Sequence, residues 1–492
     1  MRMWGIQGFN SALMVDKITK YSALVKDETK AIYELEKAYY ISGNARPGPV
    51  WIDLPMDIQG KQVALSDLSH FKLPKKVRQD IPDLDINKVL DLINQSERPV
   101  FWLGHGIRLS GAVNKIKFLL KKYKFPSLVS WAGLDMLEDN HPLNYGRAGV
   151  YGNRSANFVL QNSDLVIAIG NRMAIPMIGY VNDELARDAK FIQIDIDSYE
   201  LDKTKNFVDL SLSCDAGIFI NKLIDNYESL KINKNKLKNW VKICDGYKKR
   251  YPLVGPEHVD KNGFINSYNF ISKLSKTFKE DQIVTTDAGT ALLSGHQAIT
   301  LKKNQRIMTS TGLGEMGYGL PAAIGASFGK NKGEIICLNC DGGIMMNLQE
   351  LQTVVHHQLP IKIFIFNNDG YLMIKHTQKN LFKGRYVGTD KKSGVSCPDF
   401  SRVADAFKIQ YYSIKTWADF DKNIPNIQNE NTPVICDVFM DPEQFFYPKL
   451  SLAANKDGSI VSPPLEDLSP LLPRAVLNDE MLIGLHPKSK NL

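Results

Sequence analysis

The strongest chemical pattern joins an acidic residue and an asparagine that follow two apolar runs. The run 335–338 leads into Asp341-Gly342-Gly343, and the run 361–366 leads into Asn367-Asn368. Continuous apolar runs are typical of parallel strands buried on both faces. A carboxylate and a carboxamide at the carboxyl ends of two such strands point into the crevice where α/β proteins bind ligands. Their oxygens suit Mg²⁺, which takes few ligands from the protein and the rest from a diphosphate and water.

Glycines accompany these polar residues and indicate a phosphate. Gly342 and Gly343 would let the backbone approach a phosphate closely, and the helix that follows them offers free N–H groups. Taken singly, Asp-Gly-Gly and Asn-Asn-Asp-Gly are ordinary turn sequences, so the joint spacing carries the argument. Two further segments repeat the pattern: 310–326 contains five glycines, and 284–291 is a strand end with Gly289 and Thr290.

The whole arrangement resembles thiamine-diphosphate (ThDP) enzymes of the acetolactate-synthase type. Asp341-Gly342, a spacer and Asn367-Asn368 resemble the ThDP signature, and the likeness extends to 45–55, 146–152 and 193–197. The resemblance implies an α/β fold of doubly wound parallel sheets, with ThDP and Mg²⁺ as cofactors. The implied metal ligands are Asp341, Asn368 and Gly370. The implied cofactor-binding residues are Gly289, Thr290, Gly314, Met316, Asp341, Gly342, Gly343, Asn368, Gly370 and Tyr371.

Two of these residues have a particular role in the family. By position, Met316 would support the bent conformation of the cofactor, and the Gly314 carbonyl would hold its amino group. Ordinary core packing is the alternative for a methionine.

The resemblance also implies a reaction and a partner. The expected activity is decarboxylation of a small-molecule 2-keto acid of the pyruvate type, followed by joining to a second carbonyl compound. The cofactor supplies the electron sink, and the protein supplies orientation and electrostatics. Because the family holds the cofactor between two subunits, we expect a homodimer or a homotetramer.

Three positions depart from acetolactate synthases. Cys340 replaces the first glycine of the signature, and Thr290-Ala291 stands where Gln-His is usual. Thr377 lies near the position of a substrate-pocket tryptophan, which favours a different or more polar acceptor. Leu372, Met373 and Ile374 could form an apolar wall of the pocket or pack as an ordinary helix, and His376 is expected to be exposed on that helix.

The acid that activates the cofactor in this family, a glutamate of the pyrimidine-binding domain, has no counterpart here. In the family this glutamate lies before a segment that 17–21 of this chain resembles, whereas Glu28, Glu34 and Glu36 follow 17–21 and are expected to be solvated. We therefore assign no catalytic residue. A truncated reading frame and a natural fragment completed by a separate chain are both open. A catalytically silent ThDP-binding or oligomerisation subunit is the alternative function, and a general Rossmann nucleotide binder is a third.

The central part of the chain is compatible with a second cofactor, FAD, but does not favour it. Gly104, Gly106 and Gly111 follow a strand and open a helix, but such a pattern alone is weak. The family's FAD-binding sequence after the next strand is replaced by Asn171-Arg172-Met173. His105 is expected to be a loop residue.

Strand and linker patterns divide the chain into six parts. Residues 1–58 contain too little to bury a core and are expected to be the end of an incomplete pyrimidine-binding domain. The remaining parts are a linker at 59–84, a central Rossmann-like domain at 85–225, a linker at 226–263, a diphosphate- and Mg²⁺-binding domain at 264–445 and an extended C-terminal arm at 446–492.

Composition excludes several other classes of protein. The 492 residues carry a net charge of +8, but the lysines are dispersed, so we expect no nucleic-acid partner. No apolar run reaches the length of a membrane span, so we expect no membrane partner. Six scattered cysteines fit a reducing cytoplasm, and the pair Cys337 and Cys340 is expected to pack in the core.

Overall fold

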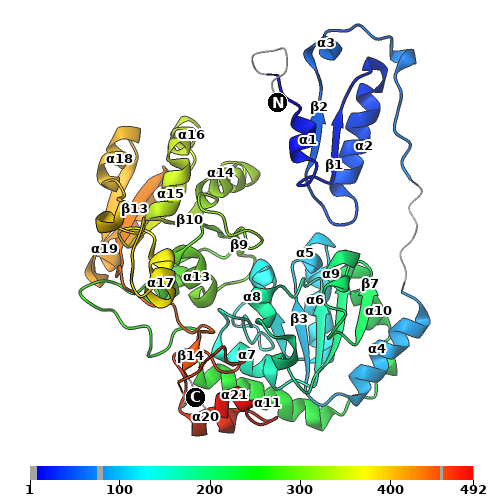
Figure 1. The fold of residues 1–492 in the computed structure, drawn as a ribbon, viewed down its shortest axis with the longest axis vertical. Helices are drawn as coiled ribbons and strands as arrows, with labels where there is room; N and C mark the ends of the chain where they lie inside the picture. Colours follow the sequence, from blue (N-terminus) through cyan, green and yellow to red (C-terminus); the bar gives the residue numbers. More distant parts are fainter. Residues whose placement is uncertain (1–7, 75–80, 455–457, 491) are drawn as a thin grey trace. The chain divides into compact units, whose positions relative to one another are not determined.

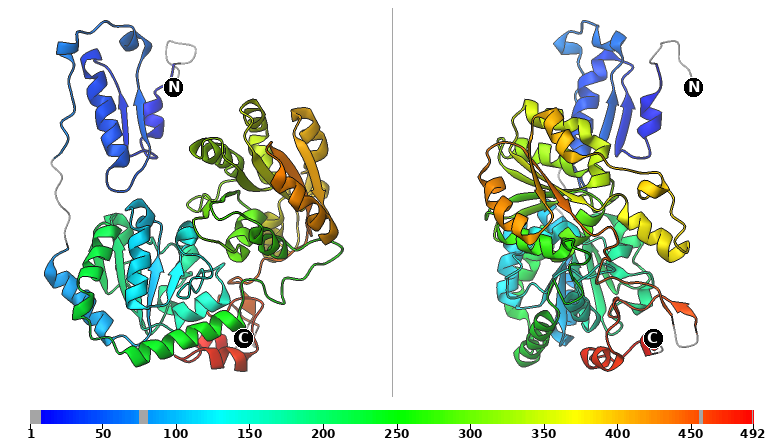
Figure 2. Two further views of the ribbon diagram at one scale, coloured as in Figure 1. Left: turned by 180° about the vertical axis from the view of Figure 1, so that it is seen from behind. Right: turned by 90° about the vertical axis from the view of Figure 1, so that its left-hand side faces the viewer.

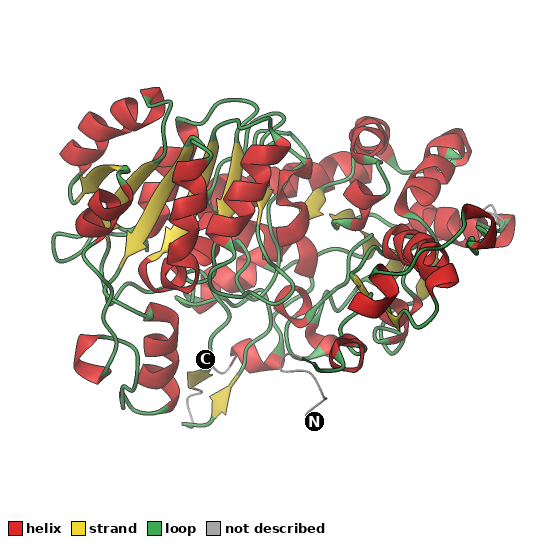
Figure 3. Cartoon of the chain, turned by 90° about the horizontal axis from the view of Figure 1, so that it is seen from above, coloured by secondary structure: helices red, strands yellow, loops and turns green. Residues whose placement is uncertain are grey.

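Continuous apolar runs form the central strands of two parallel sheets. The computed structural model describes residues 8–74, 81–454, 458–490 and 492, and it divides into two units (Figure 1). Unit 1 comprises Met1–Asp80 with Ile196–Asp202, and unit 2 comprises Ile81–Asp195 with Lys203–Leu492. Both large sheets belong to unit 2, and helices cover their strands (Figure 3). The expected fold of doubly wound parallel sheets is therefore confirmed.

The C-terminal sheet of unit 2 has six parallel strands in the order β12-β13-β11-β10-β8-β9. The strands are β8 (Ile283–Thr286), β9 (Arg306–Met308), β10 (Ile335–Cys340), β11 (Ile361–Asn367), β12 (Gln410–Ile414) and β13 (Val434–Phe439). The helices are α12 (Ser267–Lys276), α13 (Thr290–Ala298), α14 (Gly319–Gly329), α15 (Asp341–Ile344), α16 (Leu351–His356), α17 (Leu372–Leu381), α18 (Phe400–Phe407) and α19 (Trp417–Asn429).

The central strands of this sheet are apolar throughout because both of their faces are covered. In β11, Ile363 and Ile365 pack into one hydrophobic cluster, whereas Phe364 and Phe366 pack into another on the opposite face. The chain runs from β8 outward to β9 and then back past β8 to β10, so the strand order reverses between β8 and β10. Loops at such a reversal are the usual ligand-binding place of an open α/β sheet.

The central sheet of unit 2 has five parallel strands in the order β4-β3-β5-β6-β7. The strands are β3 (Pro99–Leu103), β4 (Ser127–Val129), β5 (Leu165–Ile169), β6 (Lys190–Asp195) and β7 (Leu210–Ser213). Its main helices are α4 (Asp83–Gln95), α6 (Val113–Tyr123), α7 (Arg154–Gln161) and α10 (Ala216–Asp225). The order reverses between β3 and β5, where the loop containing Gly104 and Gly106 meets Gly170.

These two loops pack directly on each other. Gly104 donates a backbone hydrogen bond to Ile169 (2.9 Å), and Gly106 donates one to Gly170 (3.0 Å). A Cβ atom on Gly104 would lie 2.1 Å from the Gly170 carbonyl oxygen, which no side chain tolerates. Contacts within the protein therefore account for both glycines, and the pattern needs no dinucleotide to explain it. His105 lies in this loop as expected, with Nδ1 2.8 Å from the Ala132 carbonyl oxygen.

Unit 1 is small and has little core. Its parallel strands β1 (Tyr21–Leu24) and β2 (Val50–Asp53) are accompanied by α1 (Ser11–Val15), α2 (Ala31–Gly43) and α3 (Met56–Gln59). Of the described residues 8–74, the buried hydrophobic ones are Val25, Ala38 and Ile58. Large apolar side chains such as Tyr39 and Leu65 are more than four-fifths exposed.

The stretch 226–263, expected to be a linker, instead contains a long helix that is part of the central core. Helix α11 (Lys234–Arg250) buries Trp240, Cys244 and Tyr247 and packs against α7. The Trp240 indole N–H donates to the Pro99 carbonyl (3.1 Å), which ties α11 to the start of β3.

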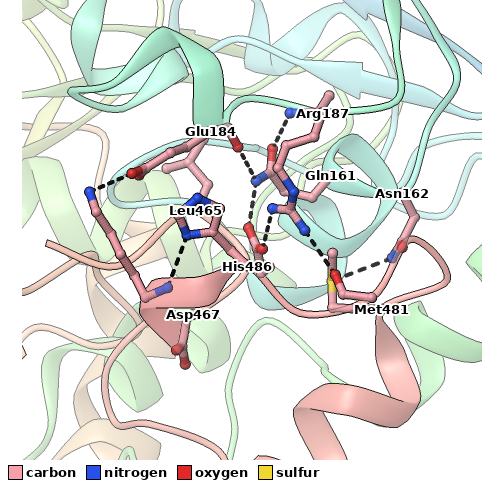
Figure 4. Close-up of polar contacts among 12 residues, drawn as sticks. Gln161, Asn162, Glu184, Arg187, Leu465, Asp467, Met481 and His486 are labelled. Atoms are coloured by element: carbon pink, nitrogen blue, oxygen red, sulfur yellow. Dashed lines mark hydrogen bonds and ion pairs between the residues drawn. The ribbon is translucent and has the colours of Figure 1, made fainter. Parts of the chain in front are cut away.

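The C-terminal stretch also differs from an extended arm, since its described part is bound tightly to the central domain. It includes α20 (Arg474–Glu480) and α21 (Pro487–Lys490), beside α11 in both views (Figure 2). Glu466 is almost fully buried and accepts from Gln161 Nε2 (2.5 Å) and Arg187 Nη1 (2.7 Å), as Figure 4 shows for the two donors.

No helix of the described residues is both long and apolar enough to cross a membrane.

Asn162 connects this C-terminal stretch to α7 and α11. Its Nδ2 donates to the carbonyls of Phe158 (3.0 Å) and Glu480 (2.9 Å) and to the Tyr247 hydroxyl (3.1 Å). Its Oδ1 accepts from the Leu482 N–H (2.7 Å), and the side chain is fully buried. Its contact with the Met481 sulfur is drawn in Figure 4.

We predict that Asn162→Ala lowers the free energy of unfolding by about 3 kcal/mol, because it leaves several buried polar groups without partners. Urea denaturation followed by circular dichroism measures this loss. The matched control is Asn226→Ala, whose partly exposed side chain donates only to the Lys222 carbonyl (2.9 Å). A loss no larger than that of the control would contradict the connecting role of Asn162.

Candidate functional site

Asp341 lies at the carboxyl end of β10, as the first residue of α15, and its side chain is fully buried. Its Oδ1 accepts from the Gly342 N–H (2.8 Å). Its Oδ2 accepts from the N–H groups of Asn368 (3.1 Å) and Gly370 (2.9 Å), which follow the neighbouring strand β11. One carboxylate thus joins the loops of two adjacent strands, and it brings together the three residues that the sequence predicts as metal ligands.

Burial makes the charged form of this carboxylate costly. It raises the pKa of Asp341 to about 7, although the three N–H donors act in the opposite direction and the neighbouring Asp437 adds to the rise. A bound cation would favour the ionised form, because opposite charges stabilise each other in a poorly solvated place.

Asn368 completes the polar group with its carboxamide. Its Nδ2 donates to the Thr290 hydroxyl oxygen (2.8 Å), and its Oδ1 is buried without a hydrogen-bond partner among the described residues. A buried acceptor without a partner is unusual and calls for an explanation such as an ion. Within the described ranges, no cluster of three or more His, Cys, Asp or Glu could hold a metal. One carboxylate, one amide oxygen and a backbone carbonyl of Gly370 nevertheless fit Mg²⁺, which prefers few protein ligands.

The glycines of this site are required by neighbouring atoms of the protein itself. A Cβ on Gly342 would lie 2.2 Å from the Tyr371 ring, and a Cβ on Gly343 would lie 1.9 Å from Asp287 Oδ2. Gly370 has a φ of +131°, and a Cβ there would lie 2.2 Å from the Thr389 carbonyl oxygen. Close approach of a phosphate, the reason inferred from sequence for Gly342 and Gly343, is therefore not needed to explain those two glycines.

The loop after β8 lies beside this group. Gly289 has a φ of +89° and precedes Thr290, the first residue of α13. Cys340 contacts this loop: its thiol donates to the Ala288 carbonyl (3.2 Å) and accepts from the Ala291 N–H (3.3 Å). The cysteine that replaces the first signature glycine thus fits the loop. Cys337 is buried on the opposite face of β10, so the expected core packing of the two cysteines is confirmed.

Sequence reasoning missed Asp287. Its carboxylate is fully buried, and burial raises its pKa to about 6. It accepts from the Gly319 N–H (3.4 Å) at the start of α14, which links the β8 loop to the glycine-rich segment. The signal in the sequence was its position directly after an apolar strand, the same feature that marked Asp341.

Gly314 and Met316 lie in the loop between β9 and α14. Gly314 has a φ of +66°, and the Met316 side chain is 40% exposed, so core packing does not explain this methionine. The residue after Met316, Gly317, accepts at its carbonyl from Asn347 Nδ2 (2.7 Å), in the segment that follows α15. The glycine-rich loop is thereby held to the segment that begins at Asp341.

Helix α17, which follows Tyr371, differs from expectation at one residue. His376 is buried, with its ring 5.3 Å from that of Phe445 and 5.4 Å from that of Phe446, so the predicted exposed histidine is wrong. Burial lowers its pKa to about 4, which keeps the imidazole neutral. Leu372 packs in the core, whereas Ile374 and Thr377 are exposed.

The three glutamates considered for activation of the cofactor make ordinary surface contacts in unit 1. Glu28 pairs with Lys61 (2.8 Å), and Glu36 accepts from His70 Nδ1 (2.9 Å). Glu34 accepts from the Tyr21 hydroxyl. All three side chains are partly exposed, so the expectation of solvated side chains is met only in part.

We predict a pH-dependent difference in the free energy of unfolding between Asp341→Asn and wild type, both without ligand. As the pH rises from about 4 to about 7, this difference should shift steadily in favour of Asp341→Asn. The native protein keeps the Asp341 proton up to a pKa of about 7, whereas the unfolded chain releases it near 3.9. The stability that this proton contributes is complete below pH 4 and lost as the pH rises, by about 1.4 kcal/mol per pH unit.

Denaturant titrations of both proteins at several pH values measure this difference. Asp405→Asn, whose side chain is 81% exposed, is measured alongside as the control for replacing a carboxylate with an amide. A difference between Asp341→Asn and wild type that does not change with pH would contradict the buried, protonated carboxyl.

Comparison with known proteins agrees with this geometry. Residues 287–438 match the model of the thiamine pyrophosphate enzyme C-terminal TPP binding domain, and residues 86–223 match that of the central domain. The chain is 30% identical over 431 residues to the acetolactate synthase isozyme 1 large subunit of Escherichia coli, covering 88% of this chain and 74% of that one. It is 30% identical over 441 residues to the acetolactate synthase large subunit of Cyanidium caldarium, covering 88% and 74%. The Escherichia coli isozyme 2 large subunit is 28% identical over 464 residues, covering 94% and 77%. The chain therefore belongs to the thiamine-pyrophosphate enzyme family, among the relatives of acetolactate synthase large subunits.

Proposed function

We propose that this chain binds ThDP and Mg²⁺ and decarboxylates a 2-keto acid of the pyruvate type, joining the product to a second carbonyl compound. The single observation that carries the proposal is the buried pair of Asp341 and Asn368. Asp341 is a carboxylate that burial keeps difficult to ionise, and Asn368 Oδ1 is a buried oxygen without a partner among the described residues. A divalent cation satisfies both at once.

The residues of the site divide into four roles. Asp341, Asn368 and the Gly370 carbonyl would hold Mg²⁺, while Gly289, Thr290, Gly342 and Gly343 would hold the diphosphate. Gly314 and Met316 would support the organic part of the cofactor, and Tyr371 fixes the signature loop through its contact with Gly342. When bound, ThDP supplies the electron sink on which decarboxylation depends. The protein supplies binding, orientation and exclusion of water.

The proposal includes a partner subunit. Apolar side chains near the glycine-rich loop are exposed in the single chain, among them Leu313 and Met346. Exposed apolar residues gathered beside a site favour a protein interface. We propose a homodimer or homotetramer, together with a polypeptide that supplies the activating glutamate, since no glutamate of this chain is assigned to that role. The six free cysteines fit a reducing cytoplasm.

The alternative function is a catalytically silent subunit that binds ThDP or supports assembly. It shares the metal and diphosphate residues with the enzyme, so cofactor binding does not separate the two. Turnover does separate them.

We predict that Asp341→Ala abolishes the Mg²⁺-dependent binding of ThDP, because it removes the carboxylate that joins the loops after β10 and β11. The increase in melting temperature on addition of ThDP with Mg²⁺ measures binding. Asp405→Ala, on the exposed end of α18, is the matched control and should bind as wild type does. Normal binding by Asp341→Ala would show that the site assignment is wrong.

We predict that the ThDP- and Mg²⁺-loaded protein releases carbon dioxide from pyruvate slowly, because no residue of this chain is assigned as the activating acid. Adding the separately expressed pyrimidine-binding domain of a related acetolactate synthase should raise that rate about 100-fold or more, since one acid–base group typically contributes about 10²- to 10⁴-fold. Coupled assay of carbon dioxide release provides the measurement. ThDP binding without turnover, unchanged by the added domain, would favour the silent subunit.

A further inference from the structure

The loop after β8 contains Thr290, which makes a contact that was not predicted from the sequence. The family resemblance implies only that Thr290 binds the cofactor, whereas in the structure its Oγ1 lies 2.8 Å from Asn368 Nδ2 and accepts a hydrogen bond from it. Thr290 and Asn368 are both at least nine-tenths buried, so water does not compete for this contact. The contact crosses from the loop after β8 to the loop after β11, over the end of β10 that lies between them.

We propose that Thr290 is a positioning residue that turns the carboxamide of Asn368 so that its oxygen faces the bound cation. The inference rests on the proposed function, because it concerns the same metal site. A carboxamide has an oxygen that can ligate a cation and an NH₂ group that cannot. When Oδ1 faces the cation, the buried Nδ2 needs an acceptor of its own, and Thr290 Oγ1 is that acceptor.

The Thr290 hydroxyl can accept this hydrogen bond and still donate its own hydrogen. A threonine hydroxyl has one hydrogen and two lone pairs, so accepting from Asn368 leaves the hydrogen free to donate to a diphosphate oxygen. Thr290 would then link the metal ligand to the phosphate, as a second layer around the cation. Partners of this kind fix the orientation of metal ligands in many proteins.

The loop around Thr290 is held rigidly enough for such a role. On its N-terminal side, the Cys340 thiol donates to the Ala288 carbonyl (3.2 Å), and on its C-terminal side the Ala291 N–H donates to the same sulfur (3.3 Å). The Thr290 carbonyl also accepts from the Ser294 hydroxyl (2.7 Å) within α13. Cys340, in the place of the signature glycine, therefore supports the residue that stands where the related synthases have glutamine.

The experiment compares Thr290→Val with Thr290→Ser. Valine keeps the shape and the β-branch but removes the acceptor, whereas serine keeps the hydroxyl. At saturating ThDP, the Mg²⁺ concentration that gives half of the full rise in melting temperature should increase about 10- to 100-fold in Thr290→Val. It should stay near the wild-type value in Thr290→Ser. The melting temperature of each free variant is measured as well, because Thr290→Val leaves the buried Nδ2 of Asn368 without an acceptor and should lose some stability. A merely structural role would lower this melting temperature and leave the Mg²⁺ concentration at half of the full rise unchanged.

The outcomes separate this inference from the proposed function. Wild-type protein that shows no Mg²⁺-dependent ThDP binding would overturn both. Wild-type binding with an unchanged Mg²⁺ requirement in Thr290→Val would overturn the role of Thr290 alone. If Thr290→Val does not fold, Thr290→Ala is measured in the same way. Failure of both variants to fold would show that the hydroxyl stabilises the fold, which also overturns the positioning role.

Discussion

The site depends on a carboxylate buried completely at the end of a central strand. Taking an ionised carboxylate out of water costs several kcal/mol unless other groups compensate for it. Three backbone N–H groups approach Asp341, yet burial still raises its pKa to about 7. The loops after β10 and β11 must therefore stay together to supply these donors, and a cation is the remaining group that would stabilise the charge at neutral pH.

This constraint explains the dense packing around the signature. Side chains, not only a cofactor, occupy the space beside each glycine: Tyr371 lies against Gly342, and Asp287 lies against Gly343. Asp287 in turn accepts from the start of α14, so that the loops after β8, β9 and β10 form one connected structure. The strand order reverses between β8 and β10, which brings these loops to the place where open α/β sheets bind ligands.

The buried parts of the fold were predictable from sequence, and the exposed parts were not. The apolar runs 99–103, 165–169 and 283–286 predict strands that coincide with β3, β5 and β8, because strands covered on both faces must be continuously apolar. The edge strands β7, β9 and β12 lack such a run and were not predicted, because half-covered strands mix polar and apolar residues. Helix α11 was taken for a linker because lysines outnumber the apolar residues of its buried stripe.

The same limit applies to the site. Asp341 and Asn368 were found because their position after apolar strands places them at one sheet edge. The contact of Thr290 with Asn368 and the burial of His376 depend on side-chain orientation between separate elements, which residue spacing does not determine.

A crystal structure of the protein with ThDP and Mn²⁺, located by the anomalous scattering of manganese, tests the central claim most directly. We predict one manganese peak about 2.1–2.2 Å from an Asp341 carboxylate oxygen and from Asn368 Oδ1, slightly longer than the distances of Mg²⁺. It should also contact the Gly370 carbonyl and the diphosphate. A peak elsewhere, or ThDP bound without a metal between these residues, would contradict the account.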